Sequence, residues 1–125
     1  MSLQILLIDD SEADHHLFKS IVEKDHPNCH IQSAFDGNEA IEILDKHDKA
    51  FDVIFLDVNM PGMNGYEFME AYGENLHEQN IPVYILTSAK HKGESKLFSP
   101  YPSIVDLCSK TPDCAKVLQI LSQFT

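Results

Sequence analysis

The chain has 125 residues, which suits one domain, and 43% of them are hydrophobic, which excludes a disordered chain. The formal net charge is −11, and the nine Lys and Arg residues form no basic stripe. This charge disfavours direct binding to nucleic acid or to an anionic membrane, because both need clustered cations.

Three cysteines, Cys29, Cys108 and Cys114, cannot all pair within one chain, and none belongs to a CxxC motif. The simplest interpretation is reduced thiols in a cytoplasmic protein. The N-terminus lacks the charged and long apolar regions of a signal peptide, and no apolar stretch approaches the length of a membrane span.

The first elements expected are a buried strand and a helix. Leu3–Ile8 is a short apolar run followed by Asp9-Asp10, which is typical of a buried strand in a parallel sheet. Ser11 is placed to cap a helix. The apolar residues at helical spacing that we expect to face inward are Leu17, Phe18, Ile21 and Val22. Adjacent His15 and His16 point in different directions on a helix, so we expect a solvated face there and no metal site.

The middle of the chain repeats this alternation. Ile31–Phe35 predicts a second, more exposed strand, and Asn38 is the expected N-cap of a second helix. Phe51–Leu56 is the most apolar strand. After a Pro/Gly-rich turn, Tyr66–Tyr72 is expected to be helical.

The last third carries a less regular stretch. Ile81–Leu86 predicts a fourth strand and Ile104–Cys108 a short fifth one. Between them, Ala89–Ser103 begins with helix-compatible residues but meets two prolines, which predicts a shortened fourth helix. Pro112 begins the last helix. Alternating strands and helices predict an α/β fold with a five-stranded parallel sheet and helices on both faces.

Chemically active side chains stand just after the predicted strands. Asp9 and Asp10 follow the first strand, Asp57 ends the third, Thr87 follows the fourth and Lys110 follows the fifth. The carboxyl ends of parallel strands lie at one edge of the sheet, where ligands bind in such folds. We therefore expect these five residues to share one site.

This set of residues predicts a cation and a phosphoryl group. Three crowded carboxylates repel one another, and a hard divalent cation such as Mg²⁺, which prefers oxygen ligands, relieves that repulsion. A hydroxyl from Thr87 and an ammonium group from Lys110 are suited to hold a phosphoryl group. Asp57 is then placed to attack phosphorus and carry the phosphoryl as a mixed anhydride.

With these residues in order, and with the loop FLDVNMPGMNG around Asp57, the sequence resembles the receiver domains of two-component response regulators over essentially its whole length, 1–125. It is similar to the single-domain, chemotaxis-regulator-like members. The resemblance implies a flavodoxin-like (βα)₅ doubly wound fold. It also implies Mg²⁺ held directly by Asp10 and Asp57, by the backbone carbonyl of Asn59, and by Asp9 largely through water. The implied donor to Asp57 is a phosphohistidine on a sensor histidine kinase or a histidine phosphotransfer protein, with Thr87 and Lys110 holding the phosphoryl group.

The sequence departs from the family pattern near the fifth strand. Receivers often carry Tyr or Phe three residues before the lysine, but this chain has Leu107. We therefore expect any output to run through backbone shifts of residues Thr87–Ser103. Asn59 and Ala89 flank the expected path of water to the phosphoryl, and neither is a carboxylate. This predicts slow autodephosphorylation and no other enzymatic activity.

Other interpretations remain open. Asp9-Asp10 and Thr87 could each merely cap a helix, and Asp57 could be a turn residue. A pseudo-receiver would keep the fold and bind partner proteins without phosphorylation. A Mg²⁺-dependent phosphatase would want a second aspartate at position 59, and a flavin-binding protein would need a phosphate loop after the first strand. The leading hypothesis is a single-domain response regulator with no output domain in this chain.

Overall fold

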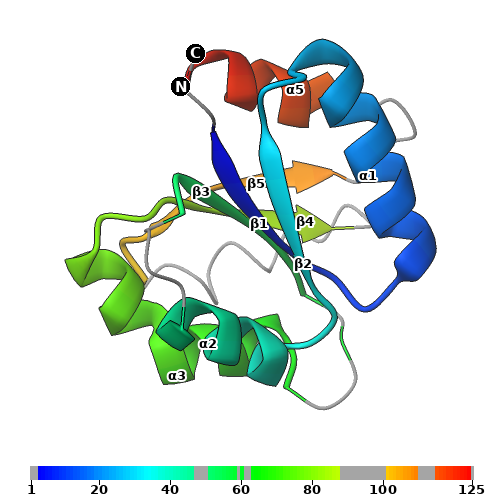
Figure 1. Ribbon diagram of the computed structural model, residues 1–125. Helices are drawn as coiled ribbons and strands as arrows, with labels where there is room; N and C mark the ends of the chain where they lie inside the picture. Colours follow the sequence, from blue (N-terminus) through cyan, green and yellow to red (C-terminus); the bar gives the residue numbers. More distant parts are fainter. Residues whose placement is uncertain are drawn as a thin grey trace.

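A five-stranded parallel sheet forms the centre of the molecule. The computed structural model describes residues 3–46, 51–58, 60, 63–87, 101–109 and 115–124. The strands have the order β2-β1-β3-β4-β5 (Figure 1). They are β1 (Gln4–Ile8), β2 (His30–Ala34), β3 (Val53–Asp57), β4 (Val83–Thr87) and β5 (Ile104–Ser109). This is the flavodoxin-like order, in which the direction of strand progression reverses between β1 and β3.

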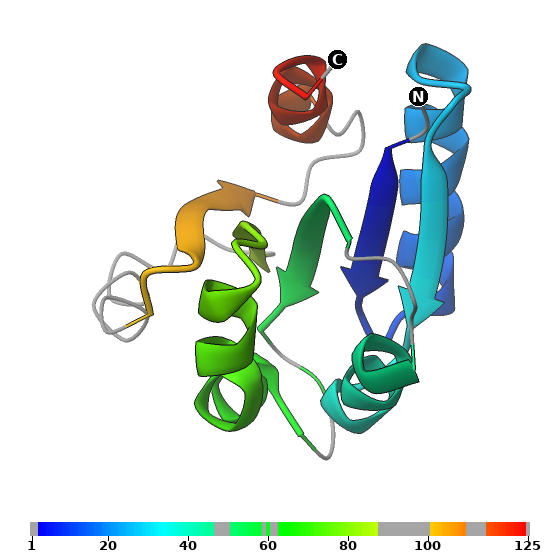
Figure 2. The same cartoon turned by 60° about the vertical axis from the view of Figure 1, so that its left-hand side comes forward.

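Helices cover both faces of the sheet, as the sequence predicted. On one face lie α1 (Glu12–Asp25) and α5 (Ala115–Ser122), and on the other α2 (Gly37–Lys46) and α3 (Gly65–Glu78) (Figures 1 and 2). Of the stretch Ala89–Ser103, the structure describes only the loop at 101–103. The shortened helix expected in this stretch lies outside the described residues. Within the described ranges, no helix is long and apolar enough to cross a membrane.

Alternation along the strands separates two hydrophobic clusters. In β1, Leu6 and Ile8 pack with α2 and α3, whereas Ile5 and Leu7 pack with α1 and α5. Successive side chains of a strand point to opposite faces, so one apolar run supplies both clusters. The edge strand β2 is more exposed than β1, which confirms its predicted place away from the centre.

The helix starts confirm one predicted cap and correct another. The Ser11 hydroxyl accepts a hydrogen bond from the Asp14 N–H, as expected for an N-cap. The prediction of Asn38 as the cap of α2 is wrong. The carboxylate of Asp36 accepts the Glu39 N–H at 2.8 Å, and its carbonyl accepts the Ala40 N–H at 3.1 Å. Asp36 is therefore the cap, and the helix begins two residues earlier than an Asn38 cap allows.

The buried stripe of α1 also differs from the prediction. His15 is 3% exposed and faces the sheet, whereas Leu17, expected inward, is 41% exposed. His15 precedes the buried Phe18 and Val22 by three and seven residues, which is the spacing of a single helix face. Only His16 of the histidine pair lies on the solvated face, where it is within 3.8 Å of Glu12.

The buried thiol of Cys108 predicts alkaline instability. Cys29 and Cys108 are both free thiols, and Cys114 lies outside the described residues. Burial raises the pKa of Cys108 from 9.0 to about 11. The folded protein therefore holds this proton more tightly than the unfolded chain does, and the protonated thiol contributes to the stability of the fold. This contribution is complete below pH 9.0 and is lost as pH rises through about 11. We expect the free energy of unfolding to fall by up to about 1.4 kcal/mol per pH unit in this window.

Urea unfolding across that pH window measures the effect. Cys108→Ala lowers stability at neutral pH by removing core contacts, but its stability should fall less steeply with pH than that of the wild type. Equal slopes for the two proteins would contradict the assignment to Cys108.

Candidate functional site

Three carboxylates meet at the carboxyl edge of the sheet. Asp9 and Asp10 follow β1, and Asp57 ends β3, which pairs with β1 through Ile8 and Leu56. One carboxylate oxygen from each of the three aspartates lies within 4.8 Å of the others. Asp9 is 1% exposed and Asp57 is 5% exposed, while Asp10 is exposed to solvent. The fold therefore brings together the three acidic residues that the sequence singled out.

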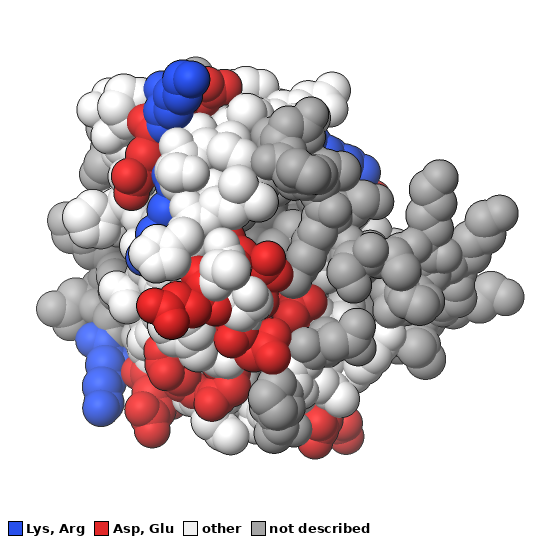
Figure 3. Space-filling model, turned by 90° about the vertical axis from the view of Figure 1, so that its right-hand side faces the viewer, with Lys and Arg blue, Asp and Glu red and all other residues white. Residues whose placement is uncertain are grey.

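The donor set fits a hard divalent cation. All three groups offer oxygen, two of them are buried, and carboxylates this close repel one another unless positive charge lies near them. Asp and Glu side chains also gather on the surface seen from the α1 side (Figure 3). Such a surface raises the local concentration of cations.

The backbone around Asp9 is held from several directions. The Asp9 N–H donates to the Ala34 carbonyl at 3.0 Å, and the Asp9 carboxylate accepts the Ser11 N–H at 3.0 Å. On the other side of the residue, Nε2 of His15 lies 2.7 Å from the Asp9 carbonyl oxygen. The sequence did not reveal this last contact, although the helical spacing of His15 from Phe18 and Val22 was the available signal.

Asp57 is placed by close packing of α3 against the end of β3. The Gly65 N–H donates to the Val58 carbonyl at 3.0 Å. A Cβ on Gly65 would lie 2.9 Å from the carbonyl oxygen of Asp57 and 3.0 Å from Cα of Val58. Both neighbours are backbone atoms, so they cannot move aside as a flexible side chain can.

We expect Gly65→Ala to destabilise the fold by about 1–3 kcal/mol, because the start of α3 must shift away from Asp57. Urea unfolding measures this loss. Gly73→Ala is the matched control in the same helix, where the added Cβ meets the side chain of Tyr101 at 3.2 Å. A larger loss for Gly73→Ala than for Gly65→Ala would contradict this account of the close approach.

The other predicted site residues are described only in part. Thr87 is the last residue of β4, next to the strand that carries Asp57, and Leu86 pairs with Asp57 itself. Asn59, Ala89 and Lys110 lie outside the described residues. Leu107, at the position that is often aromatic in the family, is partly buried and packs against the cluster formed with α2 and α3.

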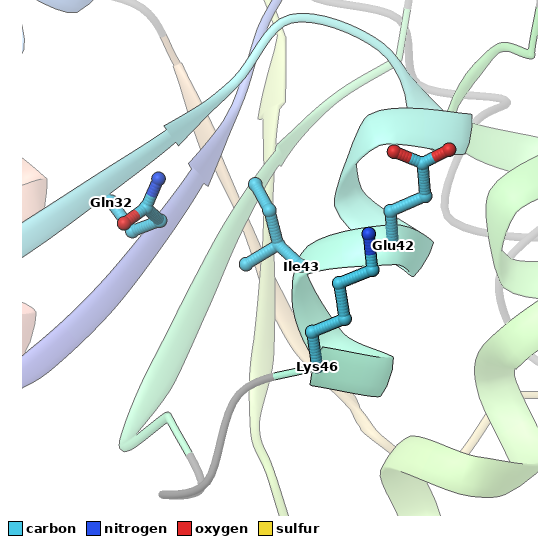
Figure 4. Close-up of a pocket in the computed structure, with 4 residues that line it drawn as sticks. All are labelled: Gln32, Glu42, Ile43 and Lys46. Atoms are coloured by element: carbon cyan, nitrogen blue, oxygen red, sulfur yellow. The ribbon is translucent and has the colours of Figure 1, made fainter.

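A separate hollow of about 290 Å³ lies between β2 and α2 (Figure 4). It is lined by Gln32, Glu42, Ile43 and Lys46. Glu42 and Lys46 come from successive turns of the same helix, and none of the three carboxylates lines the hollow. The hollow is therefore distinct from the carboxylate cluster.

Comparison with known proteins places the chain in a family. A family model for the response regulator receiver domain matches residues 5–121. The chain is 32% identical over 109 residues to protein-glutamate methylesterase/protein-glutamine glutaminase 3 of Vibrio cholerae, covering 86% of this chain and 29% of the relative. It is 30% identical over 94 residues to the response regulator PleD of Caulobacter vibrioides, covering 75% of this chain and 20% of the relative. The chain thus spans less than a third of either relative.

Solved structures show the same fold. The chemotaxis response regulator CheY4 of Vibrio cholerae matches with a TM-score of 0.83 and 24% identity over 100% of both chains. The response regulator TrrA of Thermotoga maritima, solved in complex with Mg(2+)-BeF, matches with a TM-score of 0.80 and 19% identity, covering 98% of this chain and 99% of that one. The strand order, the family model and these neighbours agree: the chain belongs to the response regulator receiver domain family.

Proposed function

We propose that the protein is a phospho-accepting response regulator in which Asp57 receives a phosphoryl group from a phosphohistidine. The observation that carries this proposal is the cluster of Asp9, Asp10 and Asp57 at the carboxyl edge of the sheet. Asp57 ends the central strand β3, so its carboxylate lies at the edge of the sheet where the strand order reverses between β1 and β3, the place where ligands bind in folds of this kind.

The acidic residues would hold Mg²⁺, with Asp10 and Asp57 as direct ligands and Asp9 acting largely through water. The backbone carbonyl of Asn59 would complete the protein ligands. When bound, the cation neutralises charge on the carboxylates and on the phosphoryl oxygens. Thr87 would donate a hydrogen bond to the phosphoryl group, and Lys110 would supply a compact positive charge.

In the transfer step, a carboxylate oxygen of Asp57 attacks phosphorus and forms the new P–O bond. The P–N bond to the donor imidazole breaks, and the imidazole nitrogen keeps the electron pair and takes a proton from water. The product is an aspartyl phosphate, a mixed anhydride that water hydrolyses slowly. The protein's role is therefore positioning and charge stabilisation, with no further catalytic activity.

The proposed partners are a sensor histidine kinase or a histidine phosphotransfer protein, and a downstream protein that recognises the phosphorylated state. We propose that residues 1–125 act as one receiver domain in the cytoplasm. The net charge of −11 supports a role without direct contact to nucleic acid or to an anionic membrane.

A small phosphodonor tests the proposal without the kinase. Wild-type protein incubated with Mg²⁺ and acetyl phosphate should gain the mass of one phosphoryl group, and EDTA should prevent the gain. Asp57→Asn should show no gain, whereas Asp25→Asn, at the exposed end of α1, should behave as the wild type does. Phosphorylation that persists in Asp57→Asn would overturn the assignment. Failure of the wild type with every donor would favour a pseudo-receiver that binds partners without phosphorylation.

A further inference from the structure

The side chain of His15 links α1 to the strand end that carries the acidic pair. The residue is 3% exposed, and Nε2 of its ring lies 2.7 Å from the carbonyl oxygen of Asp9. A carbonyl oxygen can only accept, so Nε2 carries the hydrogen and donates it. Among the described residues, Nδ1 has no hydrogen-bond partner. Within the described residues, the hydrogen bond to Asp9 is therefore the only one that the ring makes.

The ring of His15 also packs against an aromatic side chain next to β2. The ring of Phe35, which follows β2, lies with its centroid 4.4 Å from that of His15 at an interplanar angle of 43°. The carbonyl of the preceding Ala34 accepts the Asp9 N–H at 3.0 Å. Asp9 is thus held by β2 through its N–H and by α1 through its carbonyl.

The held carbonyl belongs to the peptide group that joins Asp9 to Asp10. A shift of the backbone between the two residues would change the direction in which their carboxylates point. Mutual repulsion of the three clustered carboxylates favours their separation when no cation is bound. The hydrogen bond from His15 restrains this stretch of backbone and so opposes that separation.

We infer that His15 is a positioning residue for the cation site, because its Nε2–H group holds the Asp9 carbonyl and so preorganises the carboxylates. This inference rests on the proposed function, in which these carboxylates hold Mg²⁺. Groups that orient metal ligands without touching the metal contribute substantially to metal affinity. The competing explanation is that the ring only fills space beside Phe35.

Two substitutions separate the effect of the hydrogen bond from the effect of ring packing. His15→Phe keeps a ring beside Phe35 but has no donor, whereas His15→Gln keeps an N–H donor and loses the ring. Isothermal titration of each folded protein with Mg²⁺ should show about tenfold weaker binding for His15→Phe and a change of less than about threefold for His15→Gln. Wild-type affinity in His15→Phe, or equal weakening in both variants, would overturn the inference.

A control and a second measurement complete the test. Val22→Ala removes buried volume from the same helix and should lower the melting temperature without changing Mg²⁺ affinity. A wild-type protein that binds no Mg²⁺ would overturn the proposed function together with this inference, whereas wild-type binding with an unaffected His15→Phe overturns the inference alone.

Should His15→Phe not fold, the wild-type protein itself supplies the answer. The Hε2 proton of His15, assigned by its loss in His15→Gln, should exchange slowly with solvent and shift in the NMR spectrum during Mg²⁺ titration. A proton that exchanges rapidly with solvent in the absence of Mg²⁺ would overturn the inference, because the hydrogen bond would then not be formed in advance.

Discussion

At a Mg²⁺ concentration one hundred times its dissociation constant, the free energy of unfolding of the wild-type protein is expected to rise by about 2.7 kcal/mol. The reason is that, on the proposed function, the cation would bind the folded cluster of Asp9, Asp10 and Asp57, whose oxygens lie within 4.8 Å of one another, and not the unfolded chain. Asp57→Asn removes one negative charge and one proposed ligand, so most of this stabilisation should be lost. Thermal unfolding with Mg²⁺ and with EDTA measures both values.

The behaviour without metal provides an internal check. In EDTA, Asp57→Asn should be at least as stable as the wild type, because the substitution relieves repulsion between buried carboxylates. Asp25→Asn, which removes an exposed charge at the end of α1, should retain the full Mg²⁺ effect. Equal stabilisation of Asp57→Asn and the wild type by Mg²⁺ would show that the cation binds elsewhere.

The largest loss of stability is expected for Phe55→Ala. Phe55 is fully buried in β3. The centroid of its ring lies 5.3 Å from that of Phe18 of α1 in an edge-to-face contact, and 5.7 Å from that of Tyr84 of β4 in a stacked contact. Removing this ring leaves a cavity between the central strands and the helix, which costs about 3–5 kcal/mol. This is a large share of the 5–15 kcal/mol or so that typically stabilises a domain. The midpoint of urea unfolding should fall accordingly.

Phe124→Ala is the matched control for that substitution. Phe124 follows α5 and is among the exposed large hydrophobic residues, so the same truncation there should cost less than about 1 kcal/mol. A comparable loss at both positions would mean that the contacts around Phe55 are not the source of its effect.

The strands were the most predictable part of the molecule. Apolar runs such as Leu3–Ile8 and Phe51–Leu56 have the length and composition of buried parallel strands, and polar residues end them abruptly. The alternation of strands and helices then restricts the topology to a parallel sheet with helices on both faces. For the same reason, the sequence alone assigns Asp9, Asp10 and Asp57 to one edge of the sheet.

Local patterns were less reliable where several neighbours compete for one role. Asp36, Gly37 and Asn38 are all suited to a helix start, and only the hydrogen bonds identify Asp36 as the cap. Leu17 is more hydrophobic than His15, yet His15 occupies the buried position and Leu17 is exposed. The register of a helix on its sheet decides which residues are buried, and side-chain hydrophobicity alone does not determine that register.

The sequence by itself therefore determined the fold class, the three clustered carboxylates and the resemblance to receiver domains, because each follows from the spacing of residues along the chain. Tertiary structure alone decided how that cluster is supported. The bond from His15 to the Asp9 carbonyl depends on how α1 packs against β1 and Phe35, and the close approach of Gly65 depends on how α3 packs against β3. Both contacts involve backbone atoms of the acidic residues, and the spacing that places His15 on the buried face of α1 does not reveal which backbone atom it meets.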